Sequence, residues 1–499
     1  MRNKIQFVLV FILLSFGIKA QTYYYDFNQG CEKAYQQLME LDFDSATFFI
    51  HEEKNKHPEN LIPVLLENYH DFLRIVIFED EDLFDQQDEF KKVRLNLWEE
   101  GPKDSPWYLS GEAQIKLQWA FARVLFDEYF TAATEINSAY HLLEDNKKKH
   151  PDFLWDNMGI GILHAMIGVV PDQYQWAMEL FGFYGTIEQG ISEVRQALIT
   201  DEIHPFQQET LFYYTFLRLN LQNDSARMAE LLEFYHQPQM IPQIERSPLL
   251  SFSNAVLLMR IDNEEAIHFL KSQESLYINS QFYYPIFLLG QALLYQLNPE
   301  SKKYLKEYVN DYSGKNYKKT ALQRLAWMSF IEGDTLQYQE IMRRLKNSGN
   351  LILDSDKSAQ KEAEMSEEAH LPHLNLLSSR ILFDGHYFER ALESLSSMEH
   401  SKMNDEVSLE YYYRKGRILH ESGDYEEALK SYRQAIKEGE ESYRYFPGKA
   451  ALMLGELEEN RGNYKAATQA YEKCLELDFN EYRRGIRAKA KAGLQRLKE

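Results

Sequence analysis

The densest cluster of glycines in the chain lies between Asn157 and Gly190, in the segment NMGIGILHAMIGVVPDQYQWAMELFGFYGTIEQG. Glycine-rich loops bind phosphate when their backbone N–H groups converge at the start of a helix, which requires glycines in the order Gly-x-Gly-x-x-Gly. Here Gly159 and Gly161 are followed by His164 at the position of the third glycine. The alternative loop that ends in Gly-Lys-Ser or Gly-Lys-Thr is absent. We therefore predict no nucleotide site and no cofactor.

Three groups of residues have the composition of a metal site. The segment HEEKNKH begins like a zinc-protease helix, but its histidines, His51 and His57, are six residues apart and point to different faces of a helix. His370 and His373 flank a proline, which disfavours one regular helix. The acidic run at residues 78–90 lacks the glycine and the ligand spacing of a calcium loop. The sequence predicts no metal ligands.

One pair of residues has the spacing of a catalytic nucleophile and its base. Ser358 and Lys361 match a Ser-x-x-Lys motif, but no supporting motif follows and no Gly-x-Ser-x-Gly turn occurs. We predict no catalytic residues and a protein that is not an enzyme. An enzyme whose site is assembled from distant residues leaves little trace in one sequence, and it stays open as a third interpretation.

The elements that carry these residues are predicted to be helical repeats. Two C-terminal segments share the same offsets of small residues, aromatic residues and a Gly-Asp or Gly-Asn turn. Their spacing resembles the tetratricopeptide repeat, in which two antiparallel helices need small residues where they cross. The resemblance implies an all-α, tetratricopeptide-like α-solenoid of antiparallel helix pairs. The matching positions are Gly416, Gly423 and Ala428 in the first segment, and Gly455, Gly462 and Ala467 in the second.

The glycine segment is better explained by close helix packing. Gly161, Ala165 and Gly168 recur at spacings of four and three, so that they form a flat stripe on one face of a helix. The apolar run that contains them is too short to span a membrane, which takes about 20 residues. Within the segment, one pattern resembles the eukaryotic tetratricopeptide family that includes the inclusion-body clearance protein, here as an exported and bacterial relative. The residues of this pattern are Pro171, Gly182, Phe183, Gly185 and Gly190.

Weaker copies of the repeat extend along the chain, at Gly333-Asp334 and at Gly385 with Ala391. We expect four parts: a signal peptide at 1–20, N-terminal helical repeats with the glycine segment at 21–200, middle helical repeats at 201–373, and C-terminal repeats with a capping helix at 374–499. Two cysteines, Cys31 and Cys474, are too few for a disulfide framework, and a single bridge between them is left open.

The first twenty residues have the layout of a cleavable secretory signal. Arg2 and Lys4 precede an apolar run from Phe7 to Ile18, which is followed by Lys19 and Ala20. We predict an exported protein, periplasmic or associated with the outer membrane if the source is bacterial, with no stable membrane insertion once the signal is cleaved. An uncleaved anchor is the alternative.

The charge of the chain restricts its partners. With 77 acidic and 55 basic residues, the formal net charge is −22. Such a chain repels nucleic acid through its overall field and favours basic partners. We therefore expect protein partners and no nucleic acid.

First helices of tetratricopeptide pairs line the concave side, and the resemblance implies that partner contacts lie there. The candidates are Tyr413, Arg417, Lys449 and Glu456, which do not reproduce the lysine and asparagine clamp that binds a C-terminal carboxylate in some relatives. The leading prediction is a non-catalytic, exported scaffold or adaptor that binds another protein. The alternative is a glycan- or nutrient-binding protein of the outer-membrane uptake type.

Overall fold

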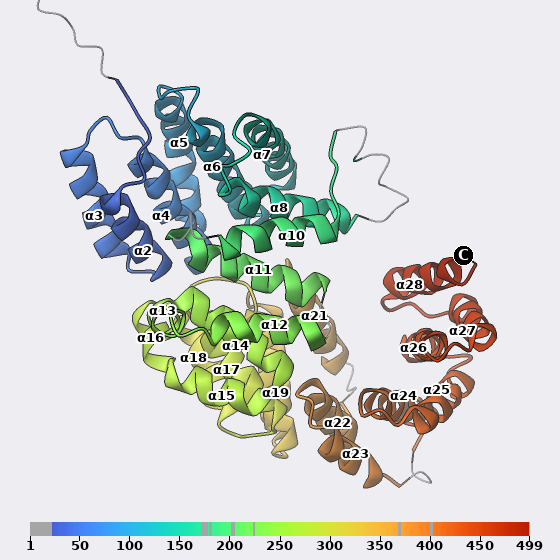
Figure 1. The fold of residues 1–499 in the computed structure, drawn as a ribbon. Helices are drawn as coiled ribbons and strands as arrows, with labels where there is room; N and C mark the ends of the chain where they lie inside the picture. The colour runs from blue at the N-terminus through green and yellow to red at the C-terminus, as the bar shows by residue number, and fades with distance from the viewer. Residues whose placement is uncertain are drawn as a thin grey trace, which may run out of the picture. The chain divides into compact units, whose positions relative to one another are not determined.

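The structure is a computed structural model, and it describes residues 22–170, 178, 182–200, 205–222, 225–367, 371–399 and 403–498. The regular secondary structure of these residues consists of 26 helices (Figure 1). Their β-structure is limited to one isolated bridge between Tyr24 and Asn60. The prediction of an all-α fold is confirmed. The proposed signal at residues 1–20 lies outside the described residues.

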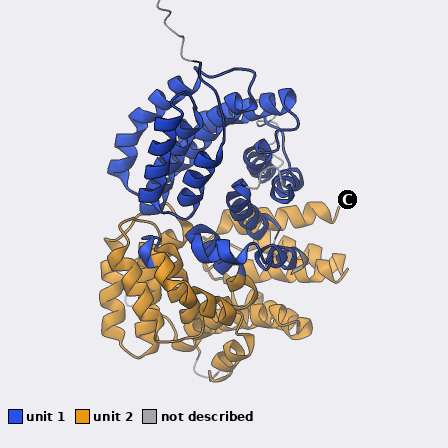
Figure 2. Ribbon diagram, turned by 60° about the vertical axis from the view of Figure 1, so that its left-hand side comes forward, with its two compact units in different colours: residues 1–257, 278–282 blue, residues 258–277, 283–499 orange. Residues whose placement is uncertain are grey.

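The chain divides into two compact units, residues 1–257 with 278–282 and residues 258–277 with 283–499 (Figure 2). The first boundary falls inside α14 (Pro248–Ile261), and α16 (Glu274–Asn279) contributes to both units. The other helices of the first unit are α2 (Gln29–Met39), α3 (Phe43–Lys56), α4 (Ile62–Phe78), α5 (Glu81–Trp98), α6 (Pro106–Leu125), α7 (Tyr129–Lys149), α8 (Asp156–Gly168), α10 (Ile187–Ile199), α11 (Gln207–Leu221), α12 (Ser225–Tyr235) and α13 (Ile241–Arg246).

The second unit holds the C-terminal repeats. Its helices are α15 (Asn263–Ser272), α17 (Tyr284–Tyr295), α18 (Ser301–Asp311), α19 (Lys318–Ile331), α20 (Thr335–Lys346), α21 (Asp354–Glu367), α22 (Leu374–Asp384), α23 (Phe388–Ser396), α24 (Asp405–Glu421), α25 (Tyr425–Glu438), α26 (Phe446–Asn460), α27 (Tyr464–Glu476) and α28 (Arg483–Arg496). Consecutive helices pack in pairs, such as α19 with α20, α24 with α25 and α26 with α27. This arrangement is the predicted tetratricopeptide-like helical repeat.

The turns inside the pairs α19–α20, α24–α25 and α26–α27 each have a glycine in the left-handed region. Gly333, Gly423 and Gly462 have φ values of +88°, +84° and +76°, which a residue with a Cβ adopts only at a cost. The next residue caps the second helix in two of the three turns: the carboxylates of Asp334 and Asp424 accept from backbone N–H groups three residues on.

The weaker copy around Gly385 differs by one residue. Gly385 has φ of −97°, and the following residue, His386, takes the left-handed conformation with φ of +66°. Ala391 lies five residues after His386, as Ala428 lies five after Gly423. His386 therefore stands where the other repeats have glycine.

Small residues lie where the paired helices cross. A Cβ on Gly416 would lie 2.6 Å from the Tyr432 ring, and one on Gly455 would lie 2.5 Å from the Tyr471 ring. Ala428 and Ala467 are fully buried at the same crossings.

The glycine segment brings α8 against α10 in the first unit. A Cβ on Gly161 would lie 2.7 Å from the carbonyl oxygen of Gly190, and one on Gly168 would lie 2.4 Å from the backbone nitrogen of Ile187. Gly185 packs on the backbone of His164. Of the remaining pattern residues, Gly182 has φ of +76°, Phe183 packs on Tyr140 with ring centres 5.0 Å apart, and Pro171 lies outside the described residues.

Cys31 and Cys474 are both free and buried. Cys474 occupies the core between α26 and α27, at the position that Ala435 holds in the preceding repeat. Among the described residues, no helix combines the length and the apolar character that a membrane span requires.

Candidate functional site

The residues with the spacing of a metal site do not converge. His51, His57 and His373 are exposed, and His370 lies outside the described residues. In the described part of the chain, no group of three or more histidine, cysteine, aspartate and glutamate side chains could hold a metal ion.

The Ser-x-x-Lys pair on α21 is bonded to the segment before α28. Lys361 Nζ lies 2.7 Å from Glu481 Oε1, and the Ser358 hydroxyl lies 3.5 Å from the Tyr482 hydroxyl. The lysine is thus engaged in an exposed ion pair and does not contact the serine as a base would.

A threonine, a histidine and an aspartate lie in line across α3 and α4. Thr47 Oγ1 is 3.2 Å from His70 Nε2, and His70 Nδ1 is 3.1 Å from Asp71 Oδ1. This order of groups resembles a nucleophile, base and orienting acid. However, the Thr47 hydroxyl donates to the Phe43 carbonyl at 2.8 Å, so its proton is not directed at His70. The network joins helices, since Asp71 also pairs with Arg94 of α5.

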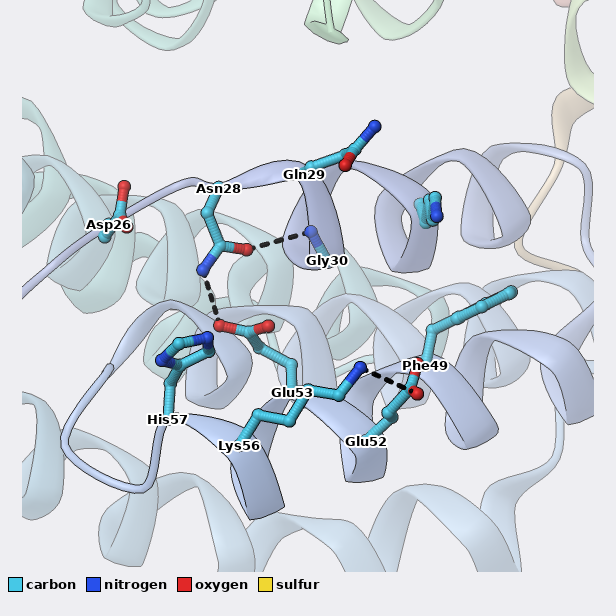
Figure 3. Close-up of a pocket in the computed structure, with 10 residues that line it drawn as sticks. Asp26, Asn28, Gln29, Gly30, Phe49, Glu52, Glu53, Lys56 and His57 are labelled. Atoms are coloured by element: carbon cyan, nitrogen blue, oxygen red, sulfur yellow. Dashed lines mark hydrogen bonds and ion pairs between the residues drawn. The ribbon is translucent and has the colours of Figure 1, made fainter.

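A polar pocket of about 420 Å³ lies between the start of α2 and the end of α3 (Figure 3). Asn28 Oδ1 accepts from the backbone N–H of Gly30 at 2.9 Å, while its Nδ2 donates to Glu53 Oε1 at 2.6 Å. Lys56 pairs with Glu52 at 2.8 Å. Asn28 thus caps α2, and the Lys56–Glu52 pair lies within α3, so these polar groups of the pocket are paired with one another.

The four predicted contact residues lie in the C-terminal repeats of the second unit. Figure 1 shows their first helices, α24 and α26, on one side of these repeats together with α28, and the second helices α25 and α27 on the other side. We call the side formed by α22, α24, α26 and α28 the first-helix face. Arg417, Lys449 and Glu456 are half-buried on their helices.

Tyr413 lies in the core beneath this face. Only 2% of its surface is exposed, and its ring packs on Phe446 with centres 5.2 Å apart. Burial raises the pKa of Tyr413, and the positive charges of Arg417, Arg414 and Arg380 oppose that rise. Tyr413 therefore forms part of the aromatic surface on which Arg417 packs.

Arg417 is held between aromatic rings. Its guanidinium carbon lies 4.2 Å from the centre of the Phe383 ring and 5.9 Å from that of Tyr413. Cations are attracted to such ring faces. The Nε atom of Arg417 is buried, and no hydrogen-bond partner reaches it among the described residues.

Lys449 shares its surroundings with other cations. Burial lowers its pKa, and the charges of Lys489 and Arg417 lower it further, whereas Glu456 acts in the opposite direction. Among the described residues, Arg417 and Lys449 form no ion pair, whereas the neighbouring Arg414 is paired with Glu410. Half-buried cations without a counterion are energetically unfavourable, which makes them candidates for contact with a ligand.

Two further arginines continue the same face, and the sequence analysis did not identify them. Arg324 of α19 and Arg380 of α22 lie on the ring of Trp327, at 4.2 Å and 4.7 Å from its centre. Burial lowers the pKa of Arg324 and the charge of Arg380 lowers it further, whereas Tyr295, Asp384 and Glu362 act in the opposite direction.

A positional signal in the sequence could have identified Arg380. It lies six residues before the left-handed residue His386, just as Arg417 lies six residues before Gly423. If the weaker repeat is aligned on Gly385 and not on His386, Arg380 falls one residue away from the position of Arg417, and the two arginines no longer appear equivalent.

Comparison with known families agrees with these repeats. Residues 386–442 and 413–478 match the family model of the tetratricopeptide repeat. The chain is a tetratricopeptide repeat protein, a class that typically mediates protein–protein interactions. Residues 112–310 match the model described as Iml2/Tetratricopeptide repeat protein 39, so they form a domain of that family, and they include the glycine segment.

Other comparisons are less informative. The chain is similar to one in the crystal structure of the APC/C hetero-tetramer Cut9-Hcn1, with 10% identity over 94% of this chain and 95% of that chain and a TM-score of 0.23. A likeness at this TM-score does not bear on function. No curated protein matches the sequence.

Proposed function

We propose that the protein is a non-catalytic scaffold or adaptor that binds a partner protein on the first-helix face of its C-terminal repeats. The proposal rests on cations of that face that have no ion-pair partner among the described residues. Arg380, Arg417 and Lys449 lie on three successive first helices, are half-buried, and form no ion pair among the described residues. An incoming protein surface would supply the missing partners.

Binding would use shape and charge complementarity and no chemical step. Arginine and aromatic side chains supply much of the binding energy in protein interfaces, because they bury large areas and make directed contacts. The rings of Trp327, Phe383 and Tyr413 hold their arginines in fixed positions, which reduces the entropy lost on binding. Glu456 adds an acceptor beside Lys449.

The proposal also includes export, and it rests there on the charged start and the apolar run of residues 1–20. In a bacterial host, the full chain is expected in the periplasmic fraction, shortened by about 20 residues. A chain of full length in the cytoplasmic fraction would contradict this part of the proposal.

Capture of partners from intact cells tests the binding function. Cells that express the tagged chain are chemically cross-linked, and proteins captured with it are identified by mass spectrometry. The variant Arg417→Gln/Lys449→Gln is compared with the control Lys430→Gln/Arg461→Gln, which removes two cations from exposed ion pairs with Glu427 and Glu426. A partner that is lost only with the first variant supports the proposal, and equal capture by both variants opposes it.

A further inference from the structure

Basic side chains of the first-helix face and of the adjoining helix α19 form a continuous row, and we infer that this row binds a short acidic segment of the partner in extended conformation. This inference rests on the proposed function and specifies the chemistry of the partner. We define the basic row as Arg324, Arg380, Arg417, Lys449 and Lys489.

Each member of the row is linked to the next by a shared contact or by direct electrostatic interaction. Arg324 and Arg380 share the Trp327 ring, and Arg380 and Arg417 both act on Tyr413. The charges of Arg417 and Lys489 both lower the pKa of Lys449, which lies between them on α26. Five cations, from α19, α22, α24, α26 and α28, therefore follow one another across the second unit.

The row is costly without an anion. Like charges in a partly desolvated setting repel one another more strongly than in water. The Nε atoms of Arg324 and Arg417 are buried and lack hydrogen-bond partners among the described residues. Asp384 and Glu362 raise the pKa of Arg324, and Glu456 raises that of Lys449, but none of these carboxylates forms an ion pair with the row among the described residues. A carboxylate from a partner would satisfy both the charge and the unpaired donors.

The spacing of the row fits an extended segment. The helices α19, α22, α24, α26 and α28 each pack on the next in this order, and packed helices lie about 10 Å apart, so the five helices span about 40 Å. An extended chain advances about 3.3 Å per residue. Acidic residues at every third position would therefore meet successive helices, and about twelve residues would cross the row.

The charge of the whole chain favours a short segment over a polyanion. The formal net charge of −22 repels nucleic acid at long range. A segment of a few carboxylates inside a larger protein experiences less of that repulsion and still satisfies the row. The row is thus a local exception on an acidic molecule.

A defined peptide tests the inference on the intact chain from residue 21 onward. The probe is a fluorescent peptide of about twelve residues with glutamate at every third position. Both of its ends are blocked, so that no terminal carboxylate contributes. Fluorescence anisotropy measures its affinity at about 50 mM and about 300 mM NaCl. A peptide with glutamine at the same positions is the matched control. We expect saturable binding of the glutamate peptide only, weakened at least about tenfold at the higher salt.

Variants separate charge from structure. Arg417→Gln/Lys449→Gln should weaken binding of the glutamate peptide at least about tenfold, whereas Arg417→Lys, which keeps the charge but loses the planar guanidinium and its Nε donor, should weaken it less than Arg417→Gln does. Lys430→Gln/Arg461→Gln should leave it unchanged. Circular dichroism of each variant verifies the fold, and Arg417→Lys against Arg417→Gln remains a test if the double variant does not fold.

The outcomes distinguish this inference from the proposed function. Equal binding of the glutamate and glutamine peptides, or an equal effect of the control variant, would overturn the acidic segment as the occupant. If a partner is captured through this face but its binding is insensitive to salt and to Arg417→Gln, the scaffold function stands and the inference fails. Binding of a DNA oligonucleotide or of polyphosphate as tight as that of the glutamate peptide would also overturn it.

Discussion

The guanidinium carbon of Arg417 lies 4.2 Å from the centre of the Phe383 ring, which belongs to the preceding repeat. The contact joins α24 to α22 and fixes the direction in which the arginine points. A cation–aromatic contact of this kind contributes about 0.5–1 kcal/mol at an exposed site and more when desolvated. Side chains of one repeat thus position the binding groups of the next.

Arg380 should matter as much as Arg417 for partner capture, because both occupy the same position of their repeats. Arg380→Gln is expected to reduce the captured partner about as far as Arg417→Gln does. Arg390→Gln is the control, since Arg390 lies on the second helix of the same repeat and stacks on Tyr387 at 5.5 Å. Quantitative mass spectrometry of the captured material compares the three variants. If Arg390→Gln reduced the captured partner as much as Arg380→Gln, the partner would not distinguish the first helices from the second helices, and the prediction would be wrong.

The helix crossing in the glycine segment should not tolerate a methyl group. A Cβ on Gly190 would lie 2.3 Å from the carbonyl oxygen of Gly161 and 2.4 Å from the backbone nitrogen of Ala165. Since backbone atoms cannot move aside, Gly190→Ala should lower the free energy of unfolding by more than about 2 kcal/mol.

The control for that substitution is a helical glycine with free space. A Cβ on Gly485 in α28 would have no neighbouring atom within 4 Å, so Gly485→Ala should be neutral or stabilising by up to about 1 kcal/mol. Urea unfolding followed by circular dichroism measures both substitutions. A neutral Gly190→Ala would mean that α8 and α10 do not approach as closely as the structure shows.

Replacing His386 with glycine should stabilise the protein, because a residue with a Cβ is unfavourable at φ of +66°. The left-handed conformation costs a residue with a Cβ roughly 1–2 kcal/mol, part of which glycine loses again through its freedom in the unfolded chain. His386→Gly should therefore raise the free energy of unfolding by about 0.5–1 kcal/mol.

The reciprocal change is Gly423→Ala, at φ of +84° with no atom near the added methyl group. It should lower the free energy of unfolding by about 1 kcal/mol. Thermal unfolding compares the two variants. Changes of the same sign in both would show that the two turns are not equivalent.

Glu209 should make the stability of the first unit depend on pH. Tyr35 and Tyr69 donate their hydroxyls to Glu209 Oε2 at 2.5 Å and 3.0 Å. Burial raises the pKa of Glu209 from 4.5 to about 7, and the hydrogen bonds from the tyrosines oppose that rise. The folded state therefore holds this proton more tightly than the unfolded state does. The stability from this group is complete below pH 4.5 and is lost as the pH rises toward 7.

Glu209→Gln removes this titration and keeps the shape of the side chain. We compare the free energy of unfolding of the variant with that of the parent at each pH. From low pH to pH 8, this difference should shift in favour of the variant by up to about 3 kcal/mol. The difference should shrink as the pH falls to about 5. Urea unfolding at several pH values measures it. A difference that does not change with pH would show that Glu209 keeps its charge in the folded state.

The repeats could be predicted because their signals are local. Gly423 with Ala428, and Gly462 with Ala467, define a turn and a crossing within a few residues, and the structure has the turn and the crossing at those positions. The left-handed residue of the weaker repeat, His386, could not be predicted. The repeat pattern places a glycine at this turn, and the neighbouring Gly385 fits the pattern although its φ is −97°.

Which cations of the first-helix face lack a counterion could not be predicted from the sequence. Whether a cation has a counterion depends on side chains from several helices, as for Arg417 between Phe383 and Tyr413. The same holds for Glu209, whose tyrosine donors lie 174 and 140 residues away in the chain. Periodicity placed Tyr413 on a first helix, but it could not distinguish a buried support from an exposed contact.

A photo-cross-linking amino acid on the first-helix face tests the central claim most directly. Placed at Glu456, which is half-buried on α26, it should form a covalent adduct with a partner protein in intact cells. Placed at Gln469, which is exposed on the second helix α27, it should form none. Adducts at Glu456 alone would establish this face as the binding surface. Adducts at Gln469 alone, with both variants folded, would contradict the account.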